Sequence, residues 1–594
     1  MKAITILFLV ILLLSNCSKS NPTNGIPVKE PSVNIKAIEA NIENLMQGYA
    51  FHGRFSGTIL IAKDDRILYQ NSFGHADIKN GTENSNSSVY GIGSVTKQFT
   101  ATAILKLAQD GRLELTDKIS DYFPALGETV SHITIHHLLS MSSGIYEDFS
   151  RSKTYDIESI IFPEPHPIST SALVHYFGEL TSDSKPGKTY DYSNMNYILL
   201  AAIVEKVSGQ DYGEFLKENF WQKLGMNSTT FGSENVQENL LAKPYIGLPS
   251  HHKTPNYWHD SWVLGAGGAF SSAHDLHTWM YNIANRNVLD SLNTNRLFRK
   301  QISTGNDSYA YGWQVGMRKG NEYRFHDGGT LGYVCEAGYF PEHNIYMVVL
   351  TNHTHDLMEI GKSVRLNKAI VSNLQNILFD EPFTALPIPK KNSTISISGN
   401  FNVGTYNYEI SQEAGNTNII TLNNGPSILD LPFWQDLTED TKRFKKAEKI
   451  AVAFGEENFR YVRKKAGLML KILVSTKKLD QIWDEITGEK GNFLGYNFYR
   501  IPGGTIKSSY WVRLVHEKKE IGLRLSFNKR GRMMGMHIDQ SFSFGGPIQV
   551  EAKVIDDKML FVDGFKYGYP DAYIIQKEGN WILKTETAEL EIDL

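Results

Sequence analysis

The stretch "YGIGSVTKQFTATAILKLAQDG", residues 90–111, places Ser94 and Lys97 three positions apart at the start of a predicted helix. Apolar residues then recur at helical spacing: Phe99, Ala103, Ile104 and Leu107. The Ser-x-x-Lys pattern alone decides nothing, because the chain repeats it at Ser150/Lys153, Ser182/Lys185, Ser475/Lys478 and Ser526/Lys529. The first copy differs in context, since it follows Gly91 and Gly93 and opens a helix.

Ser94 and Lys97 suit nucleophilic chemistry at such a position. The positive end of a helix dipole favours developing negative charge, and i to i+3 spacing brings the lysine over the same face as the serine. A lysine surrounded by apolar side chains loses hydration as an ammonium, so that a neutral fraction can accept the serine proton. The pair therefore predicts an activated serine.

Two further elements follow in the chain. In "YDYSNMNYILLAAIVEKVSG", the triplet Tyr192-Ser193-Asn194 stands just before an apolar helix. In "YRFHDGGTLGYVCEAGYF", the run from His326 to Gly329 enters a hairpin, where glycine lets the backbone approach a substrate closely. Each is weak alone, but the three elements in this order indicate one site.

With these elements the sequence resembles the serine β-lactamase and penicillin-binding-protein-like hydrolases, in particular the class C β-lactamase and esterase branch. The family's motifs are Ser-x-x-Lys, Tyr-x-Asn and Lys-or-His-x-Gly, and residues 94–97, 192–194 and 326–328 match them in order. Further segments look like the family: "FSGTILIAKDDRILYQNSFG", "ITIHHLLSMSSGI", "FWQKLGMNST", "GAGGAFSSAHDLHTW" and "MVVLTN". The resemblance covers about residues 38–380 and does not extend to 390–594.

The resemblance implies a serine hydrolase that works through an acyl-enzyme on an ester, an amide or a D-amino-acid-containing peptide, with no cofactor and no metal. Ser94 would be the acylated nucleophile, and Lys97 and Tyr192 would share its proton. Asn194 would hold the Lys97 ammonium and a substrate amide. The N–H groups of Ser94 and Gly329 would form the oxyanion hole.

His326 takes the place that a lysine holds in true β-lactamases, and with Gly328 it would bind the substrate. An imidazole whose pKa is near ~6.5 gives a weaker and pH-dependent attraction for a substrate carboxylate than a lysine does. We therefore expect neutral esters and amides to be preferred. A β-lactamase or DD-peptidase remains an alternative, as does a catalytically silent homologue that only binds its ligand.

The opening "MKAITILFLVILLLSNCSKS" resembles a bacterial lipoprotein signal. Its apolar run from Ile4 to Leu14 is shorter than the ~20 residues that a spanning helix needs. Cys17 would then be lipidated and become the mature N-terminus, and residues 18–37 would be a tether to the membrane of the cell envelope. An ordinary signal peptide or an uncleaved anchor is the alternative.

The formal net charge of −4 over 594 residues argues against a nucleic-acid binder and favours a small-molecule or peptide substrate. The oligomeric state cannot be read from the sequence. A chain of this length is too long for one core, so two or more domains are expected. Residues 38–382 predict one α+β domain, with hairpins at 55–77 and 333–352 and helices between them.

Residues 383–394 predict a Pro-containing linker, and residues 395–594 a mostly β domain of unknown role. Within it, the basic stretch 442–478 is interpreted as a solvated strand face in preference to a site for an anionic partner. His274-x-x-His277 is interpreted as part of a capped helix rather than a metal site, and Cys335 as core packing rather than a nucleophile.

Overall fold

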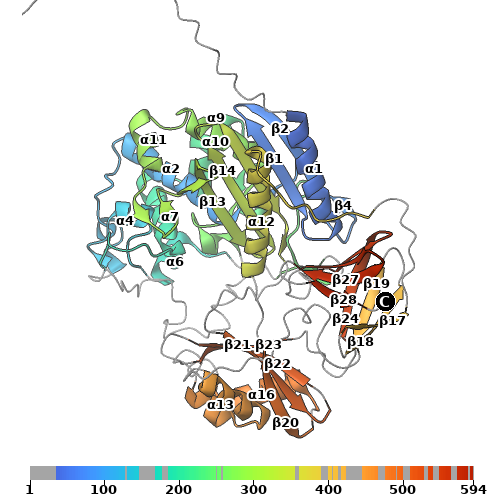
Figure 1. Ribbon diagram of the computed structural model, residues 1–594. Coiled ribbons are helices and arrows are strands. Elements are labelled where there is room, and N and C mark those ends of the chain that lie inside the picture. The colour runs from blue at the N-terminus through green and yellow to red at the C-terminus, as the bar shows by residue number, and fades with distance from the viewer. Residues whose placement is uncertain are drawn as a thin grey trace, which may run out of the picture.

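The computed structural model (Figure 1) describes most of the chain beyond residue 34. The described residues are 35–126, 130–145, 167–176, 185–248, 251–255, 259–354, 360–389, 399–403, 406–412, 417–422, 444–465, 475–489, 491–499, 509–518, 520–527, 533–539, 548–562, 571–585 and 589–592. The predicted signal peptide, Cys17 and nearly all of the tether lie outside these residues, so those expectations stay predictions.

An antiparallel eight-stranded sheet forms the centre of the first domain, in the order β10-β11-β12-β13-β14-β15-β1-β2. Its strands have these bounds: β1 Gly57–Lys63, β2 Arg66–Phe73, β10 Ile302–Ser303, β11 Ser308–Tyr309, β12 Gln314–Arg318, β13 Asn321–Thr330, β14 Tyr333–Phe340 and β15 Ile345–Thr351. Because β1 pairs with β15, the two ends of the domain meet in the middle of the sheet. This confirms the predicted hairpins and the α+β class.

Two helical layers cover the sheet (Figure 1). Helices α1 (Ile35–Phe51) and α12 (Ile360–Leu378) bury Leu45, Leu374 and other apolar side chains against one face. A larger core on the other face includes α2 (Thr96–Gln109), α7 (Asn194–Ser208) and α10 (Ala273–Ala284). The helical spacing of apolar residues in 90–111 thus marks the buried face of α2, since Phe99, Ile104 and Leu107 all lie in this core. Among the described residues, no helix is both long and apolar enough to span a membrane.

The remaining helices of this domain are short and lie mostly between β2 and β10: α3 Ile119–Tyr122, α4 Ile135–Leu139, α6 Thr170–Tyr176, α8 Tyr212–Leu216, α9 Gln222–Leu224 and α11 Ser291–Phe298. Short strands pair there as well: β3 His75–Asp77 with β4 Thr82–Glu83, β9 Ala269–Ser271 with β5 Tyr90–Gly91 and β6 Thr230–Phe231, and β7 Tyr245–Leu248 with β8 His251–Lys253 and β16 His353–Thr354. The β5–β9 pair holds the segment that enters α2.

The described residues of the C-terminal region form two separate sheets. One has the order β17-β18-β19-β24-β25-β26-β27-β28, and the other is the meander β20-β21-β22-β23. Their strands have these bounds: β17 Gly399–Val403, β18 Tyr406–Gln412, β19 Thr417–Leu422, β20 Phe493–Tyr499, β21 Ser509–His516, β22 Glu520–Phe527, β23 Met533–Asp539, β24 Ile548–Asp556, β25 Met559–Val562, β26 Ala572–Lys577, β27 Asn580–Thr585 and β28 Glu589–Ile592. The β-rich character of the region is as predicted.

The prediction of a solvated strand face at 442–478 is wrong. Helices α13 (Phe444–Gly455) and α14 (Phe459–Lys465) occupy most of the described part of this stretch, and α16 (Thr476–Thr487) begins near its end. The reason is a helical apolar period, in which Phe444, Ala447, Ile450, Ala451 and Phe454 are buried. The basic residues alternate with them and lie on the outer side, so their number reflects the amphipathic helix.

The eight-stranded C-terminal sheet also contacts the first domain. Ile555 and Phe561 belong to the same hydrophobic cluster as α1, and the buried Arg54 guanidinium donates to Asp571 over distances of 2.9 and 2.5 Å. Residues 383–389 have neither helix nor strand, as expected of the linker, yet the buried Leu386 packs into the same cluster. Apolar burial against α1 and a partly buried ion pair at Arg54 therefore hold this sheet against the first domain.

Candidate active site

Ser94 lies in the turn that leads into α2. The 3₁₀ turn η1 (Gly93–Val95) follows β5 directly and runs on into the helix. Gly93 has a φ of 48°, and a Cβ there would lie 2.7 Å from the backbone nitrogen of Gly329. The glycine is needed because a side chain would push η1 away from β13.

Lys97 is fully buried, and its Nζ has three acceptors. It donates to Ser94 Oγ at 2.9 Å, to Asn194 Oδ1 at 2.8 Å and to the carbonyl oxygen of Ala266 at 2.7 Å. The three acceptors match the three N–H groups of an ammonium. The expected apolar surroundings hold for the stem, but the head group is held by polar atoms, which changes how the serine proton is handled.

Tyr192 completes the contacts of the serine. Its hydroxyl donates to Ser94 Oγ at 2.8 Å, and its ring centroid lies 4.9 Å from Lys97 Nζ. The Tyr192 side chain is partly exposed, whereas Asn194 is the first residue of α7 and holds the lysine. The structure thus brings Ser94, Lys97, Tyr192 and Asn194 together from two segments of the chain.

His326 lies on β13 and is buried. Its Nδ1 is 2.6 Å from the carbonyl oxygen of Asp327 and its Nε2 is 3.1 Å from the hydroxyl of Tyr309. Burial, helped by the Lys97 charge and opposed by that of Asp327, lowers the pKa of His326 to about 4. The lowered pKa removes the pH-dependent attraction that an ordinary imidazole would give near neutral pH, because His326 is neutral there.

The two glycines after His326 serve different ends. A Cβ on Gly328 would lie 2.1 Å from the carbonyl oxygen of Ile92 and 2.7 Å from Cys335 Sγ. At Gly329 a Cβ would meet nothing within 4 Å. The prediction that glycine here admits a substrate therefore fits Gly329, whereas Gly328 lets β13 pack against the turn before Ser94.

A cavity of about 290 Å³ opens at these residues. It is lined by the predicted Ser94, Tyr192, His326, Gly328 and Gly329, and by Tyr190, Gln314, Asp327, Val334, Glu336, Asn367 and Lys368, which received no role from the sequence. Burial and the neighbouring Asp327 raise the pKa of the Glu336 carboxyl to about 7. A buried acid on the wall of the serine pocket is the main feature that sequence reasoning missed.

Other residues singled out in the sequence have structural roles. Cys335 is buried and its Sγ donates to the carbonyl oxygen of Ile92 at 3.0 Å, as expected of core packing. His277 is buried with Nε2 3.0 Å from the carbonyl oxygen of Asp64, while Ser272 caps α10 as predicted. Within the described residues, no three or more His, Cys, Asp or Glu side chains gather as metal ligands would.

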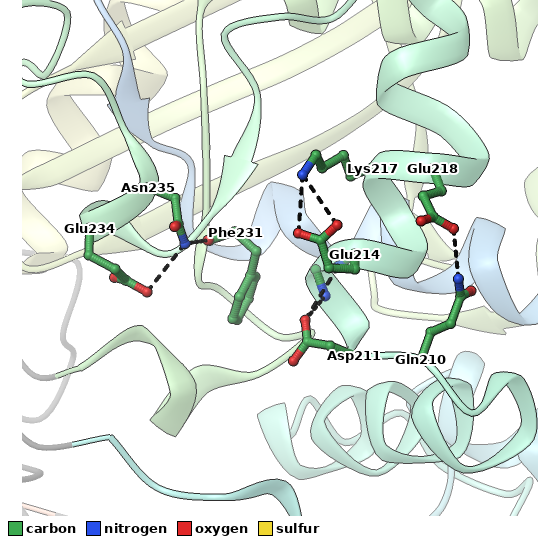
Figure 2. A network of polar contacts seen from close by, with 9 residues as sticks. Gln210, Asp211, Glu214, Lys217, Glu218, Phe231, Glu234 and Asn235 are labelled. Carbon is green, nitrogen blue, oxygen red and sulfur yellow. Dashed lines mark hydrogen bonds and ion pairs between the residues drawn. The ribbon is translucent and has the colours of Figure 1, made fainter.

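A second, larger cavity of about 1060 Å³ lies around α8, and Figure 2 shows part of its polar wall. The carboxylates there have protein partners. Glu214 pairs with Lys217 at 3.2 Å, Glu218 accepts from Gln210 at 2.7 Å, and Asp211 accepts from the backbone at the start of α8. These contacts build the α7–α8 connection, and the cavity holds none of the residues around Ser94.

Comparison with known proteins identifies the family of the chain. A family model described as Beta-lactamase matches residues 38–368, more than half of the sequence. The chain belongs to this family, and it is a serine hydrolase of the penicillin-binding-protein type. As the resemblance implied, the matched range contains all of the residues around Ser94.

Among its relatives is penicillin-binding protein 4* of Bacillus subtilis, 26% identical over 385 residues, with 60% of this chain and 80% of that protein covered. Protein flp of Staphylococcus aureus is 29% identical over 329 residues, which span 53% of this chain and 63% of the relative. The octameric penicillin-binding protein homologue of Pyrococcus abyssi has the same fold, with a TM-score of 0.54 at 19% identity, covering 93% of this chain and 99% of that one. This likeness of fold extends into the C-terminal region.

Proposed function

We propose that this chain cleaves an ester, an amide or a D-amino-acid-containing peptide through an acyl-enzyme on Ser94. The observation that carries the proposal is the pair of hydrogen bonds on Ser94 Oγ, one from Lys97 Nζ and one from the Tyr192 hydroxyl. At this Ser-x-x-Lys copy the lysine is buried, and a tyrosine and a pocket lie around the serine.

In the proposed reaction the Lys97–Tyr192 pair starts with one proton fewer, so that Tyr192 is a phenolate beside the Lys97 ammonium. Ser94 Oγ attacks the substrate carbonyl carbon and its proton passes to the phenolate oxygen of Tyr192. The pair returns the proton to the leaving alcohol or amine as its bond to the carbonyl carbon breaks. Water then attacks the acyl ester, gives one proton to the same pair, and the acid leaves while Ser94 regains its hydrogen. Each step balances with water as the only co-reactant.

The positive charge of Lys97 assists each step. Asn194 and the Ala266 carbonyl hold the ammonium beside Ser94, so that the charge faces the oxygen that becomes negative during attack. The backbone N–H groups of Ser94 and Gly329 are the proposed oxyanion hole, and both residues line the pocket. A donor of this kind contributes about 3 kcal/mol to transition-state binding in serine hydrolases.

The neutral His326 supports a preference for substrates without a carboxylate. A lysine in its place would supply a permanent charge for the carboxylate of a penicillin or a cell-wall peptide. We therefore expect short-chain nitrophenyl esters to be turned over with a higher kcat/KM than benzylpenicillin. Efficient penicillin hydrolysis with negligible esterase activity would favour the β-lactamase or DD-peptidase alternative.

Labelling with a fluorophosphonate tests the proposal. The wild type should be modified at Ser94 and the Ser94→Ala variant should not, while Ser475→Ala serves as a control from an exposed Ser-x-x-Lys copy. After labelling, the wild type and the Ser475→Ala variant should both lose esterase activity. Ser94→Ala with wild-type turnover would refute the mechanism, and labelling without any turnover of esters, amides or peptides would indicate the silent homologue.

We also propose that the chain is anchored in the cell envelope through lipid on Cys17. The support is the apolar run that ends at this cysteine, followed by a Pro-, Ser- and Asn-rich stretch that suits a tether. After expression in a bacterial host, the wild type should partition with membranes and Cys17→Ala should be released. A Cys17→Ala variant that stays fully membrane-bound would rule the anchor out.

A further inference from the structure

Two carboxyl groups face each other across adjacent strands, on the side of the sheet that α12 covers. Asp327 on β13 pairs with Glu336 on β14, two positions from the pair of Gly329 with Val334. All four residues line the same pocket as Ser94, which wraps around β13 at residues 326–329. Two residues of strand span about 7 Å, so the carboxyl groups lie within one small substrate's length of the proposed oxyanion hole.

The Glu336 carboxyl group receives a hydrogen bond on only one of its two oxygens from the described residues. The side chain is buried, and Oε1 accepts from the Tyr323 hydroxyl at 2.9 Å. Its other oxygen, Oε2, makes no hydrogen bond with the described residues and is not one of the buried atoms without a partner, so it is open to the pocket that Glu336 lines. Asn367, a buried residue of the same pocket wall, has an amide oxygen that likewise lacks a donor in this part of the chain. A buried acceptor without a donor, such as the Asn367 oxygen, is costly, and a donor on the substrate would relieve that cost.

The cationic side chains nearest to Asp327 and Glu336 are either paired with another carboxylate or exposed to solvent. Arg318 on β12 makes two 2.8 Å contacts with Asp307. Lys368 on α12 approaches Asp327 to 3.9 Å, but its side chain is 59% exposed, so solvent screens its charge. With both carboxyl groups ionised, this wall of the pocket therefore carries more negative than positive charge.

We propose that Asp327 and Glu336 form a subsite for an ammonium group, and that the substrate carries a primary amine close to its scissile bond. This rests on the proposed function, because the subsite is defined relative to the acyl group on Ser94. The amine donates to Glu336 Oε2 and neutralises the carboxyl pair. The pocket of about 290 Å³ limits the recognised part to a small group, about the size of one amino acid.

The test compares isosteric ester pairs on the wild-type protein, with hydrolysis followed by pH-stat at pH 7.5. Propyl D-alaninate and propyl isobutyrate differ by an ammonium on the acyl side. The pair 3-aminopropyl propionate and butyl propionate differs by an ammonium on the leaving-group side. We expect kcat/KM to be about 10- to 100-fold higher for the cationic ester in one of the two pairs, which is the range for a hydrogen bond to a charged group. The pair that shows this preference tells whether the ammonium group is on the acyl side or on the leaving-group side of the scissile bond.

The Glu336→Gln variant keeps the oxygen that accepts from Tyr323 but loses the charge, and it should reduce the preference by about 10-fold or more. Glu322→Gln is the matched control, because Glu322 lies on β13, pairs with Arg324 and is outside the pocket, so the preference should stay at the wild-type ratio. If both wild-type pairs show a ratio near one, or if Glu336→Gln keeps the full preference, the ammonium subsite is wrong. Loss of hydrolysis in Ser94→Ala separates this outcome from failure of the proposed function.

Discussion

Replacing Gly328 with alanine is expected to disturb the nucleophile without touching it. The new Cβ would lie 2.1 Å from the carbonyl oxygen of Ile92, whereas contacts of a Cβ begin near 3.0 Å. The turn before Ser94 would therefore have to move by about 0.9 Å, the difference between these two distances. Cys335 Sγ, which donates to the same carbonyl oxygen, would lie 2.7 Å from the new Cβ, so the alanine cannot avoid the Ile92 oxygen by moving toward Cys335.

A shift of about 1 Å at a reacting group costs about 10²-fold in rate, and overpacking of this kind destabilises a fold by about 1–3 kcal/mol. We expect both effects in Gly328→Ala, measured as the rate of fluorophosphonate labelling and the midpoint of urea unfolding. Gly329→Ala is the neighbouring control for stability, since its Cβ meets nothing within 4 Å and the midpoint should not change. Wild-type labelling and stability in Gly328→Ala would refute the packing argument.

Three further results are expected. Tyr192→Phe should lower turnover by about 10²–10⁴-fold while leaving the fold intact by circular dichroism, because it removes a proton-transfer hydroxyl from a half-exposed ring. If the leaving-group pair shows the preference, the ratio of kcat/KM for 3-aminopropyl over butyl propionate should rise from pH 6 to pH 8, because Glu336, with a pKa of about 7, loses its proton in this range while His326, with a pKa of about 4, stays neutral; a ratio that falls with pH would contradict this. Arg54→Met should lower the free energy of unfolding by about 1–3 kcal/mol, because it removes the charged hydrogen bonds to Asp571 at the contact with the C-terminal sheet; an unchanged urea midpoint would show that the ion pair does not hold this contact.

Local sequence patterns were sufficient for the residues that act through their immediate neighbours in the chain. Ser94 and Lys97 meet because they lie one turn apart at the start of α2, and glycines around them mark a close backbone approach. The hairpins at both ends of the domain could be predicted from alternating apolar residues, and their pairing in one sheet from the α+β pattern.

Features that depend on register or burial could not be predicted in the same way. Glu336 sits in "YVCEAGYF" as one polar residue of a strand, and only the pairing of β14 with β13 shows that it faces Asp327. The pKa of His326 depends on its complete burial, which no local pattern reveals. The spacing of Phe444, Ala447 and Phe454 would have predicted a helix in 444–465. The number of basic residues in this stretch led instead to the prediction of a solvated strand.

Mass spectrometry of the trapped intermediate tests the central claim most directly. The wild type would be mixed with an excess of a short-chain nitrophenyl ester, quenched in acid within the first turnover, and digested. An acyl-enzyme on Ser94 predicts that one peptide, the one containing Ser94, gains the mass of the acyl group, and that Ser94→Ala shows neither the adduct nor turnover. Turnover with the acyl group on another residue, or at the wild-type rate in Ser94→Ala, would contradict it.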